Sequence, residues 1–363
     1  MSCKWKECTL GDLITFQRGH DLPKNKMTDG KYPVVGSNGI IGYHNEYTTE
    51  SPSITIGRSG NVGNPFIFYG RTWSHNTTLY VKDFNGNDPV FVFYFLKTLD
   101  LVNYSGGSAV PTLNRNHIHT LPIKVPESAE IQKKIGYYLR LLDEKIAINR
   151  AINDNLQQQA MALYAEMFLN SSDNNVTSGT LSDIAVITMG QSPSGSSYNE
   201  DGVGEVFYQG RAEFGFRFPK RRLFTTEPKR MSEAGDVLLS VRAPVGDLNI
   251  AYERCCIGRG LGAIHSKTGH SSFVLYTMFA LRSQLDVFNG EGTVFGSINR
   301  DALNAIPIDI PPVTEIDQFE AVAHPIDELI RANYEENCRL EAIRDSLLPK
   351  LMSGEIDVSA VQL

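Results

Sequence analysis

The chain has 363 residues, of which 41% are hydrophobic and 21% are charged, so it is long enough to build packed cores in more than one domain. It contains no run of about 18 apolar residues and no apolar stretch near its start, which argues against a transmembrane helix and a secretory signal. The five cysteines form no CxxC pair. Their number is odd, which disfavours a disulfide framework or a zinc ribbon and is typical of reduced thiols in the cytoplasm.

The net charge of -7 is unevenly distributed along the chain. Residues 1–126 carry 12 Lys and Arg against 9 Asp and Glu, whereas residues 312–350 carry 4 against 9. A surface that binds phosphates needs only local positive charge, because counterion release depends on the contacts themselves. The acidic total therefore does not exclude a nucleic-acid partner.

Short strings recur in the same order, 171 to 185 residues apart. Leu10-Gly11-Asp12-Leu13 returns as Leu181-Ser182-Asp183-Ile184, and Phe91-Val92-Phe93-Tyr94 returns as Phe273-Val274-Leu275-Tyr276. The string Leu121-Pro122-Ile123-Lys124-Val125-Pro126 returns as Ile306-Pro307-Ile308-Asp309-Ile310-Pro311. Chance similarity of apolar strings is the alternative, but it does not explain matches that keep their order at nearly one offset.

Each copy has a long first part with many turns and a shorter second part. The first part contains short alternating runs such as Ser53-Ile54-Thr55-Ile56, which predict β-strands. The second part begins after Pro126 or Pro311 and predicts a helix of roughly 40 residues. We therefore expect an α+β protein with a pseudo-twofold internal repeat, in which two β-rich domains are separated by two long helices. The expected ranges are 1–126 and 171–311 for the domains, 127–170 and 312–352 for the helices, and 353–363 for a tail.

The two helical segments share a 4-3 spacing of apolar residues that is typical of an antiparallel coiled coil. The apolar positions are Ile135, Leu139, Leu142, Ile146, Leu156, Ala160, Leu163 and Met167, and then Phe319, Ala323, Ile326, Ile330, Leu340, Leu347 and Leu351. Asparagines stand at matching depths, Asn149 and Asn153 in one helix and Asn333 and Asn337 in the other. Such residues fix the register, because a slipped pair leaves a buried amide without a partner. Two helices that each pack on their own domain are the alternative, and Pro325 is expected to kink the second helix or restart it near Ile326.

At this point the chain resembles the specificity subunits of type I restriction-modification systems, over essentially its whole length. The resemblance depends on the opening Trp5-Lys6 with Leu10-Gly11-Asp12-Leu13 and on the repeated x-L-P-I-x-x-P lead into each helix. It depends also on Glu130-Ile131-Gln132-Lys133-Lys134-Ile135 and on the ending Leu347-Leu348-Pro349-Lys350-Leu351-Met352-Ser353-Gly354-Glu355-Ile356. The second copy departs from the family pattern at Glu315-Ile316-Asp317-Gln318, where the usual basic residues are missing.

The resemblance implies two target-recognition domains that each read one part of a split, asymmetric site in double-stranded DNA. It implies two modification subunits that methylate adenine with S-adenosylmethionine and restriction subunits that use ATP, so this cytoplasmic chain itself is expected to be non-catalytic, to bind no cofactor or metal and to have no membrane contact. A subunit of a type IIB-like enzyme is the nearest alternative. Two others are an enzyme housed in the β-rich parts and a scaffold that binds only proteins.

Catalytic motifs are missing from the sequence, in agreement with this division of labour. It lacks a G-x-x-x-x-G-K-[ST] phosphate loop, an N-P-P-[FY] tetrapeptide, H-E-x-x-H and G-x-S-x-G. Asn64-Pro65-Phe66 lacks the second proline of the methyltransferase motif. His117 and His119 have the spacing of two metal ligands on an extended strand, but no third ligand follows, so a structural or DNA-facing role is favoured.

The candidate DNA-binding residues are cations and polar side chains in turns. Arg58 and Arg242 each follow an apolar strand, 184 residues apart, where a guanidinium group forks onto guanine or phosphate unless it only bonds turn carbonyls. A basic cluster, expected to contact phosphates, comprises Arg217, Lys220, Arg221, Arg222, Lys229 and Arg230. Lys24, Lys26 and Lys31 are its expected counterparts in the first copy. Further candidates, for which plain turn chemistry is the alternative, are Ser37, Asn38, Ser59, Asn61, Ser74, His75, Asn76, Gln191, Gln209 and Arg211.

Overall fold

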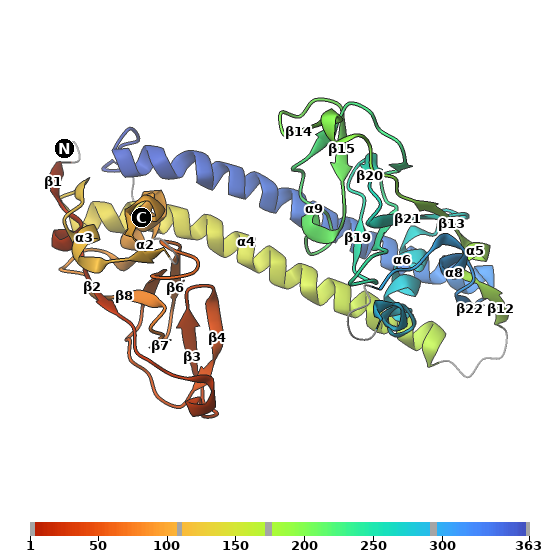
Figure 1. Ribbon diagram of the computed structural model, residues 1–363, viewed down its shortest axis with the longest axis horizontal. Coiled ribbons are helices and arrows are strands. Elements are labelled where there is room, and N and C mark those ends of the chain that lie inside the picture. The colour runs from red at the N-terminus through yellow and green to blue at the C-terminus, as the bar shows by residue number, and fades with distance from the viewer. Residues whose placement is uncertain (1–3, 107–110, 171–175, 291–295, 361–363) are drawn as a thin grey trace. The chain divides into compact units, whose positions relative to one another are not determined.

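The computed structural model describes residues 4–106, 111–170, 176–290 and 296–360. The chain divides into two compact units: the first comprises Met1–Asn149 and Glu335–Leu363, and the second comprises Arg150–Tyr334 (Figure 1). Each unit thus contains part of both long helices. Cys3 and the predicted start of the second recognition domain at residues 171–175 lie outside the described residues.

The first unit combines several small sheets with short helices. Its sheets have the strand orders β2-β8-β5-β6, β4-β3-β7, β1-β11 and β10-β9. The elements are β1 (Trp5–Thr9), α1 (Leu10–Leu13), β2 (Thr15–Arg18), η1 (Lys24–Lys26), β3 (Tyr32–Gly36), β4 (Gly39–His44), β5 (Ser53–Gly57), β6 (Pro65–Phe68), β7 (Trp73–Ser74), β8 (Thr78–Asp83), α2 (Pro89–Thr98), η2 (Leu101–Tyr104), β9 (Ser105–Gly106), β10 (Thr112–Leu113), α3 (Arg115–His119) and β11 (Pro122–Pro126).

The second unit repeats this plan with one larger sheet. Its sheets have the orders β13-β21-β18-β19, β14-β16-β15-β20-β17 and β12-β22. The elements are β12 (Thr177–Thr180), α5 (Leu181–Ile184), β13 (Ala185–Met189), η4 (Gly195–Ser197), β14 (Tyr198–Asn199), β15 (Glu205–Tyr208), η5 (Arg211–Glu213), β16 (Phe224–Thr225), β17 (Met231–Ser232), β18 (Val237–Ser240), β19 (Leu248–Ile250), β20 (Cys255–Ile257), β21 (Leu261–Ser266), α6 (Ser271–Ala280), α7 (Arg282–Asp286), η6 (Val287–Asn289), α8 (Arg300–Asn304) and β22 (Pro307–Ile310).

The repeated strings of the sequence have the same structural role in both units. The Leu10 backbone N–H donates to the Leu121 carbonyl at 2.9 Å, and the Leu181 N–H donates to the Ile306 carbonyl at the same distance. The aspartate of each Leu-x-Asp string accepts a hydrogen bond from the backbone of the threonine that begins the short helix, which forms a capping box. The repeat predicted from the sequence is therefore confirmed.

Two long helices pair within each unit, α4 (Ala129–Tyr164, followed by a π-helical turn, η3, Ala165–Leu169) and α9 (Val313–Ser353). In the first unit, Asn149 Nδ2 donates to Asn337 Oδ1 at 3.0 Å. In the second, Asn333 Nδ2 donates to Asn153 Oδ1 at 2.8 Å. Residue numbers fall on α9 as they rise on α4, so the pair is antiparallel (Figure 1). The predicted asparagine rungs are confirmed.

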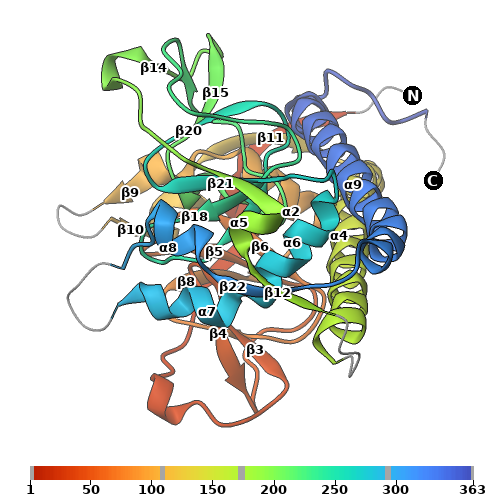
Figure 2. The same cartoon turned by 90° about the vertical axis from the view of Figure 1, so that its right-hand side faces the viewer.

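The helix α9 continues without a break through Pro325, so the predicted restart near Ile326 is wrong. A proline inside a helix costs about 3 kcal/mol, because it removes one hydrogen bond and crowds the preceding turn. Ala323 is fully buried in the core of the second unit and Ile330 is also fully buried, and Figure 2 shows α9 beside α6 there. Packing on both sides of the proline holds the helix together.

The end of the chain completes the core of the first unit. Leu351, Met352 and Val358 are buried among the same side chains as Leu10 and Leu139. The Lys134 ammonium group donates to the Ser359 carbonyl at 3.3 Å. The predicted tail is thus, over the described residues up to 360, a packed segment.

Candidate nucleic-acid interface

Three polar loops of the first unit lie together, at residues 36–39, 57–61 and 74–77. The Arg58 N–H donates to the Thr77 carbonyl at 2.8 Å, and the Ser37 N–H donates to the Thr77 hydroxyl at 3.3 Å. Asn38 and Asn61 are exposed on these loops. The structure therefore brings most of the predicted first-copy candidates onto one surface.

Some of those candidates are used inside the unit. Ser74 is fully buried, and its hydroxyl forms a 2.7 Å hydrogen bond with that of Thr49, so its predicted contact with base edges is wrong. Ser37 is also largely buried. The Asn76 amide donates to the Asp21 carboxylate, so it must give up that bond before it meets a base. His75 and Ser59 are half-buried and remain candidates.

The lysines predicted for the first copy are exposed. Lys24, Lys26 and Lys31 make no ion pair within the described residues. Thr28 lies in the loop between Lys26 and Lys31, and its N–H donates to His44 Nδ1 of β4 at 3.2 Å, which holds this loop against the strand. These cations are therefore available for phosphate contacts next to the β3–β4 hairpin.

The β3–β4 hairpin also exposes apolar side chains that sequence reasoning missed. Ile40, Ile41 and Tyr43 are 47%, 40% and 55% exposed. These apolar residues lie in a short run that predicts a strand, and nothing in the sequence distinguished them from strand residues that are buried in a core. In the structure they place an apolar surface beside the cationic loop.

In the second unit, Arg242 does not occupy the place of Arg58. The Arg58 N–H donates to Thr77 and its carbonyl accepts from Leu113, both at 2.8 Å. The same two bonds in the second unit are made by Val241, with Gly260 at 3.0 Å and Ile298 at 3.1 Å. The predicted equivalence of Arg58 and Arg242 is thus wrong by one residue. Arg242 is exposed and remains a candidate in its own right.

Gln191 and Gln209 lie on either side of a turn at residues 258–260. The Gln191 N–H donates to the Ile257 carbonyl at 3.0 Å, and the Gln209 carbonyl accepts from the Gly260 N–H at 3.2 Å. Both glutamines are exposed, as is Arg259 in the same turn. Arg259 was not predicted from the sequence as a DNA-binding residue. The string Gly258-Arg259-Gly260 was the available sequence signal, since it predicts a turn that exposes a cation. In the structure this turn corresponds to the polar turn at residues 75–77.

The predicted basic cluster includes one residue that does not face solvent. The Arg217 side chain is 3% exposed and lies 3.3 Å from both Asp327 Oδ1 and the Tyr276 hydroxyl. Its assignment to phosphate contact is therefore wrong, because the guanidinium group is held in the interior by a carboxylate on α9. Sequence proximity to other cations concealed this long-range partner.

The other members of the cluster are exposed, but two of them are neutralised. Arg221 pairs with Glu253, and Arg222 donates to Glu213 at 2.7 Å. Lys220, Lys229 and Arg230 are exposed and make no ion pair within the described ranges. Free positive charge in this segment is thus concentrated at Lys229 and Arg230 and at Lys220.

We expect Lys229→Ala/Arg230→Ala to weaken binding to all DNA sequences and to lower the salt slope of log K by up to about 2, since each phosphate contact contributes about 0.9. The matched variant Arg221→Ala/Arg222→Ala removes the same charge. We expect it to change the salt slope by less than half as much, because Glu253 and Glu213 already neutralise these two arginines. Affinity measured across a salt series checks this. Equal changes in the two variants would contradict it.

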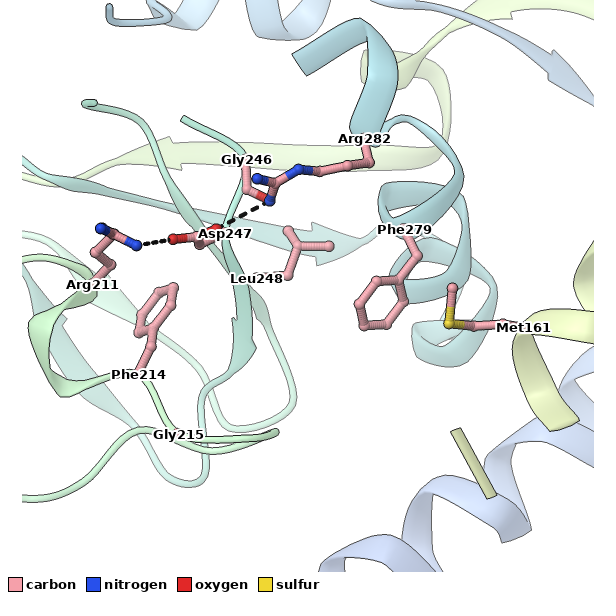
Figure 3. Close-up of a pocket in the computed structure, with 9 residues that line it drawn as sticks. All are labelled: Met161, Arg211, Phe214, Gly215, Gly246, Asp247, Leu248, Phe279 and Arg282. Carbon is pink, nitrogen blue, oxygen red and sulfur yellow. Dashed lines mark hydrogen bonds and ion pairs between the residues drawn. The ribbon is translucent and has the colours of Figure 1, made fainter. Parts of the chain in front are cut away.

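Arg211 borders a pocket of ≈ 510 Å³ in the second unit, together with Phe214, Phe279 and Arg282. Figure 3 shows Arg211 and Arg282 on two sides of Asp247. Arg282 lies 3.1 Å from this carboxylate, and Arg211 pairs with its other oxygen. Arg211 must therefore break an ion pair before it reads a base.

His117 and His119 lie on helix α3, and the prediction of an extended strand is wrong. His119 Nε2 accepts a hydrogen bond from the Phe16 N–H at 3.0 Å, which confirms a structural role for this ring. His117 is exposed. Across the described residues, no group of three or more His, Cys, Asp or Glu is arranged to hold a metal ion, and no described helix is both long and apolar enough to cross a membrane.

Burial, and secondarily the charge of Arg115, lowers the pKa of His119. As the pH falls, the unfolded chain binds the proton first, near a pKa of about 6.5, so stability present above that value is lost below it. We expect the melting temperature of wild type to fall between about pH 8 and about pH 5 more steeply than that of His119→Gln, whose amide oxygen still accepts a hydrogen bond. Parallel curves would rule out this contribution.

The two units have similar folds, and each presents polar loops and unpaired cations and contains part of both long helices. This duplicated arrangement defines a class of protein with two binding domains in one chain. The chain belongs to the family described as the type I restriction modification DNA specificity domain, whose model matches residues 3–158 and again 174–335. The resemblance found in the sequence and the predicted fold class are thus confirmed.

Relatives and a solved structure agree with this assignment. A putative type I restriction enzyme specificity subunit of Methanocaldococcus jannaschii is 31% identical over 84% of this chain and 77% of that protein. A putative type I specificity subunit of Mycoplasma pneumoniae is 24% identical, with 96% of each chain covered. The crystal structure of a type I system S subunit from M. genitalium has the same fold, with a TM-score of 0.64, 18% identity and 96% of each chain covered.

Proposed function

We propose that this chain recognises a split, asymmetric DNA site and that each unit reads one part of it. The observation that carries the proposal is that equivalent loops present different exposed side chains. The first unit exposes Asn38 and Asn61, whereas the second exposes Gln191, Gln209, Arg242 and Arg259. Two similar domains that carry different hydrogen-bonding side chains at equivalent places are expected to recognise different base sequences.

Helices α4 and α9 each belong to both units, and we infer that they set the gap between the two parts of the site. The buried asparagine pairs Asn149–Asn337 and Asn153–Asn333 hold their register, since a slip leaves these amides unpaired. The gap is then fixed by helix length, as in other readers of paired half-sites.

We propose that the chain works without catalysis or a bound cofactor, in the cytoplasm, and that two modification subunits and the restriction subunits supply the chemistry. The missing catalytic motifs and the type I relatives support this over a type IIB-like subunit. In the first unit, α4 exposes Tyr137, Leu141 and Ile148, which are 44%, 41% and 55% exposed. Spacings of four and seven residues place them on one side of the helix, an apolar stripe suited to a helix of a modification subunit.

Selection of bound fragments from random DNA tests the proposal, with the chain alone and together with its modification subunit. We expect one enriched motif with two defined parts and an undefined gap of constant length. Metal-dependent cleavage by the chain alone would support the enzyme alternative. Binding to the modification subunit without any DNA enrichment would support the scaffold alternative.

A further inference from the structure

A pocket of ≈ 570 Å³ in the first unit is lined by basic and polar side chains. It lies between strand β2, the turn after β5 and helix α3. The side chains that matter here are Gln17, Arg18, Arg58, Asn114, Arg115 and His117. Three arginines thus meet at one cavity, although they are far apart in the sequence.

Nothing within the described residues neutralises these arginines. No Asp or Glu lines the pocket, and Arg18, Arg58 and Arg115 make no ion pair in the part of the chain that the structure describes. Burial and the charge of Arg18 lower the pKa of Arg58, so the cations disfavour one another. A bound anion relieves that repulsion.

The scaffold fixes the backbone that carries these side chains before a ligand arrives. The Arg58 backbone is bonded on both sides, to Thr77 and Leu113, each at 2.8 Å. Arg18 lies in β2, opposite Leu79 of β8. Asn114 caps α3 by accepting from the Asn116 N–H at 3.0 Å, which positions Arg115 next to it. A preformed cationic site loses little entropy on binding.

Among its described residues, the second unit does not repeat this set of three arginines. The Gly19 N–H bonds the Thr78 carbonyl as the Gly190 N–H bonds the Leu261 carbonyl, so the residue before each glycine is equivalent: Arg18 corresponds to Met189. Arg58 corresponds to Val241 by the hydrogen bonds described above. Only Arg115 keeps a cation at its counterpart, Arg300. The electrostatic site is therefore specific to the first unit.

We propose that this pocket holds a phosphate group of the DNA backbone, an inference that rests on the proposed function, and that it gives the first unit a phosphate contact that the second unit does not make at the equivalent place. Guanidinium groups bind phosphate oxygens with two parallel N–H bonds, and a backbone phosphodiester presents two such oxygens.

The test variant is Arg18→Met/Arg58→Val, which gives the first unit the side chains that the second unit carries at the same places. The control is Lys82→Met/Lys124→Met, which removes the same charge from exposed positions outside the pocket that make no ion pair within the described residues. Affinity for specific and random DNA is measured in complex with the modification subunit, from about 50 to about 300 mM salt. Thermal melting confirms that both variants fold, and Arg115→Gln serves as a second pocket variant.

We expect the pocket variants to lose about tenfold in affinity for every sequence and about 1 in salt slope relative to the control, as for a lost phosphate contact. A slope equal to that of the control overturns the proposal. So does an affinity loss confined to one base position, which would make these arginines base readers.

A second measurement separates the source of the phosphate. Pyrophosphate is titrated into the wild-type protein without DNA and then used as a competitor. If pyrophosphate binds weakly and does not displace DNA at millimolar concentration, the DNA backbone is supported as the source of the phosphate. If pyrophosphate binds tightly and Arg18→Met/Arg58→Val abolishes that binding, the pocket is assigned to a free nucleotide and the DNA assignment is overturned. If wild type selects no DNA sequence, the proposed function fails, but the slope comparison on random DNA still decides the pocket.

Discussion

Replacing Asp327 by alanine is expected to lower the free energy of unfolding by about 3–5 kcal/mol, because it leaves a buried arginine without its counterion. The Arg217 side chain is 3% exposed and that of Asp327 is 13% exposed. Tyr276 is also buried and donates its hydroxyl to the same carboxylate at 2.9 Å. At this degree of burial, Arg217 has little contact with solvent that could compensate for the lost counterion.

A double variant separates this effect from simple loss of packing. We expect Arg217→Met/Asp327→Ala to recover at least about 2 kcal/mol relative to Asp327→Ala alone, since no unpaired charge remains. Denaturant unfolding gives the energies, and hydrogen exchange should place the loss in the second unit. A double variant as unstable as Asp327→Ala would contradict the buried-charge explanation.

The first unit offers a matched control. Asp143 on α4 accepts from the Tyr94 hydroxyl and from the Arg344 guanidinium, both at 2.6 Å, although this arginine lies on α9 and not in the β-rich part of the unit. The side chains of Asp143 and Arg344 are 29% and 21% exposed, so solvent screens them. We expect Asp143→Ala to cost only about 1 kcal/mol.

Exchange of residues 171–311 for those of a relative is expected to change the recognised bases in one part of the DNA site and leave the other unchanged. β12 and β22 pair at the base of the second unit, so the exchanged segment begins and ends at neighbouring strands. A wrong base pair costs about 1–3 kcal/mol, so two altered pairs shift preference about 100-fold.

Mapping methylated adenines in cells that carry the exchanged chain and its modification subunit measures this outcome. The reciprocal exchange of residues 1–126 is the control and should change the other part. A gap of unchanged length is expected in both, because α4 and α9 are retained. Changes in both parts from a single exchange would contradict independent reading by the two units.

Most of the fold was predictable because its signals are local or periodic. The heptad spacing and the asparagines at matching depths identified the helix pair, and repeated strings identified equivalent elements. Arg217 was mispredicted because its partner Asp327 lies 110 residues away and nothing nearby in the sequence marks it as buried. The one-residue error at Arg242 arose because an insertion shifts the offset between the copies, which only the hydrogen-bond register resolves.

The position of the last residues has a consequence for how the protein matures on the ribosome. Residues 150–334 form one contiguous unit, whereas the unit that begins at the N-terminus also needs Leu351, Met352 and Val358 in its core. Residues 1–149 therefore keep apolar surface uncovered until residues 351–358 have been synthesised. Nascent chains that stop short of residue 350 should contain a folded second unit and an incompletely folded first unit.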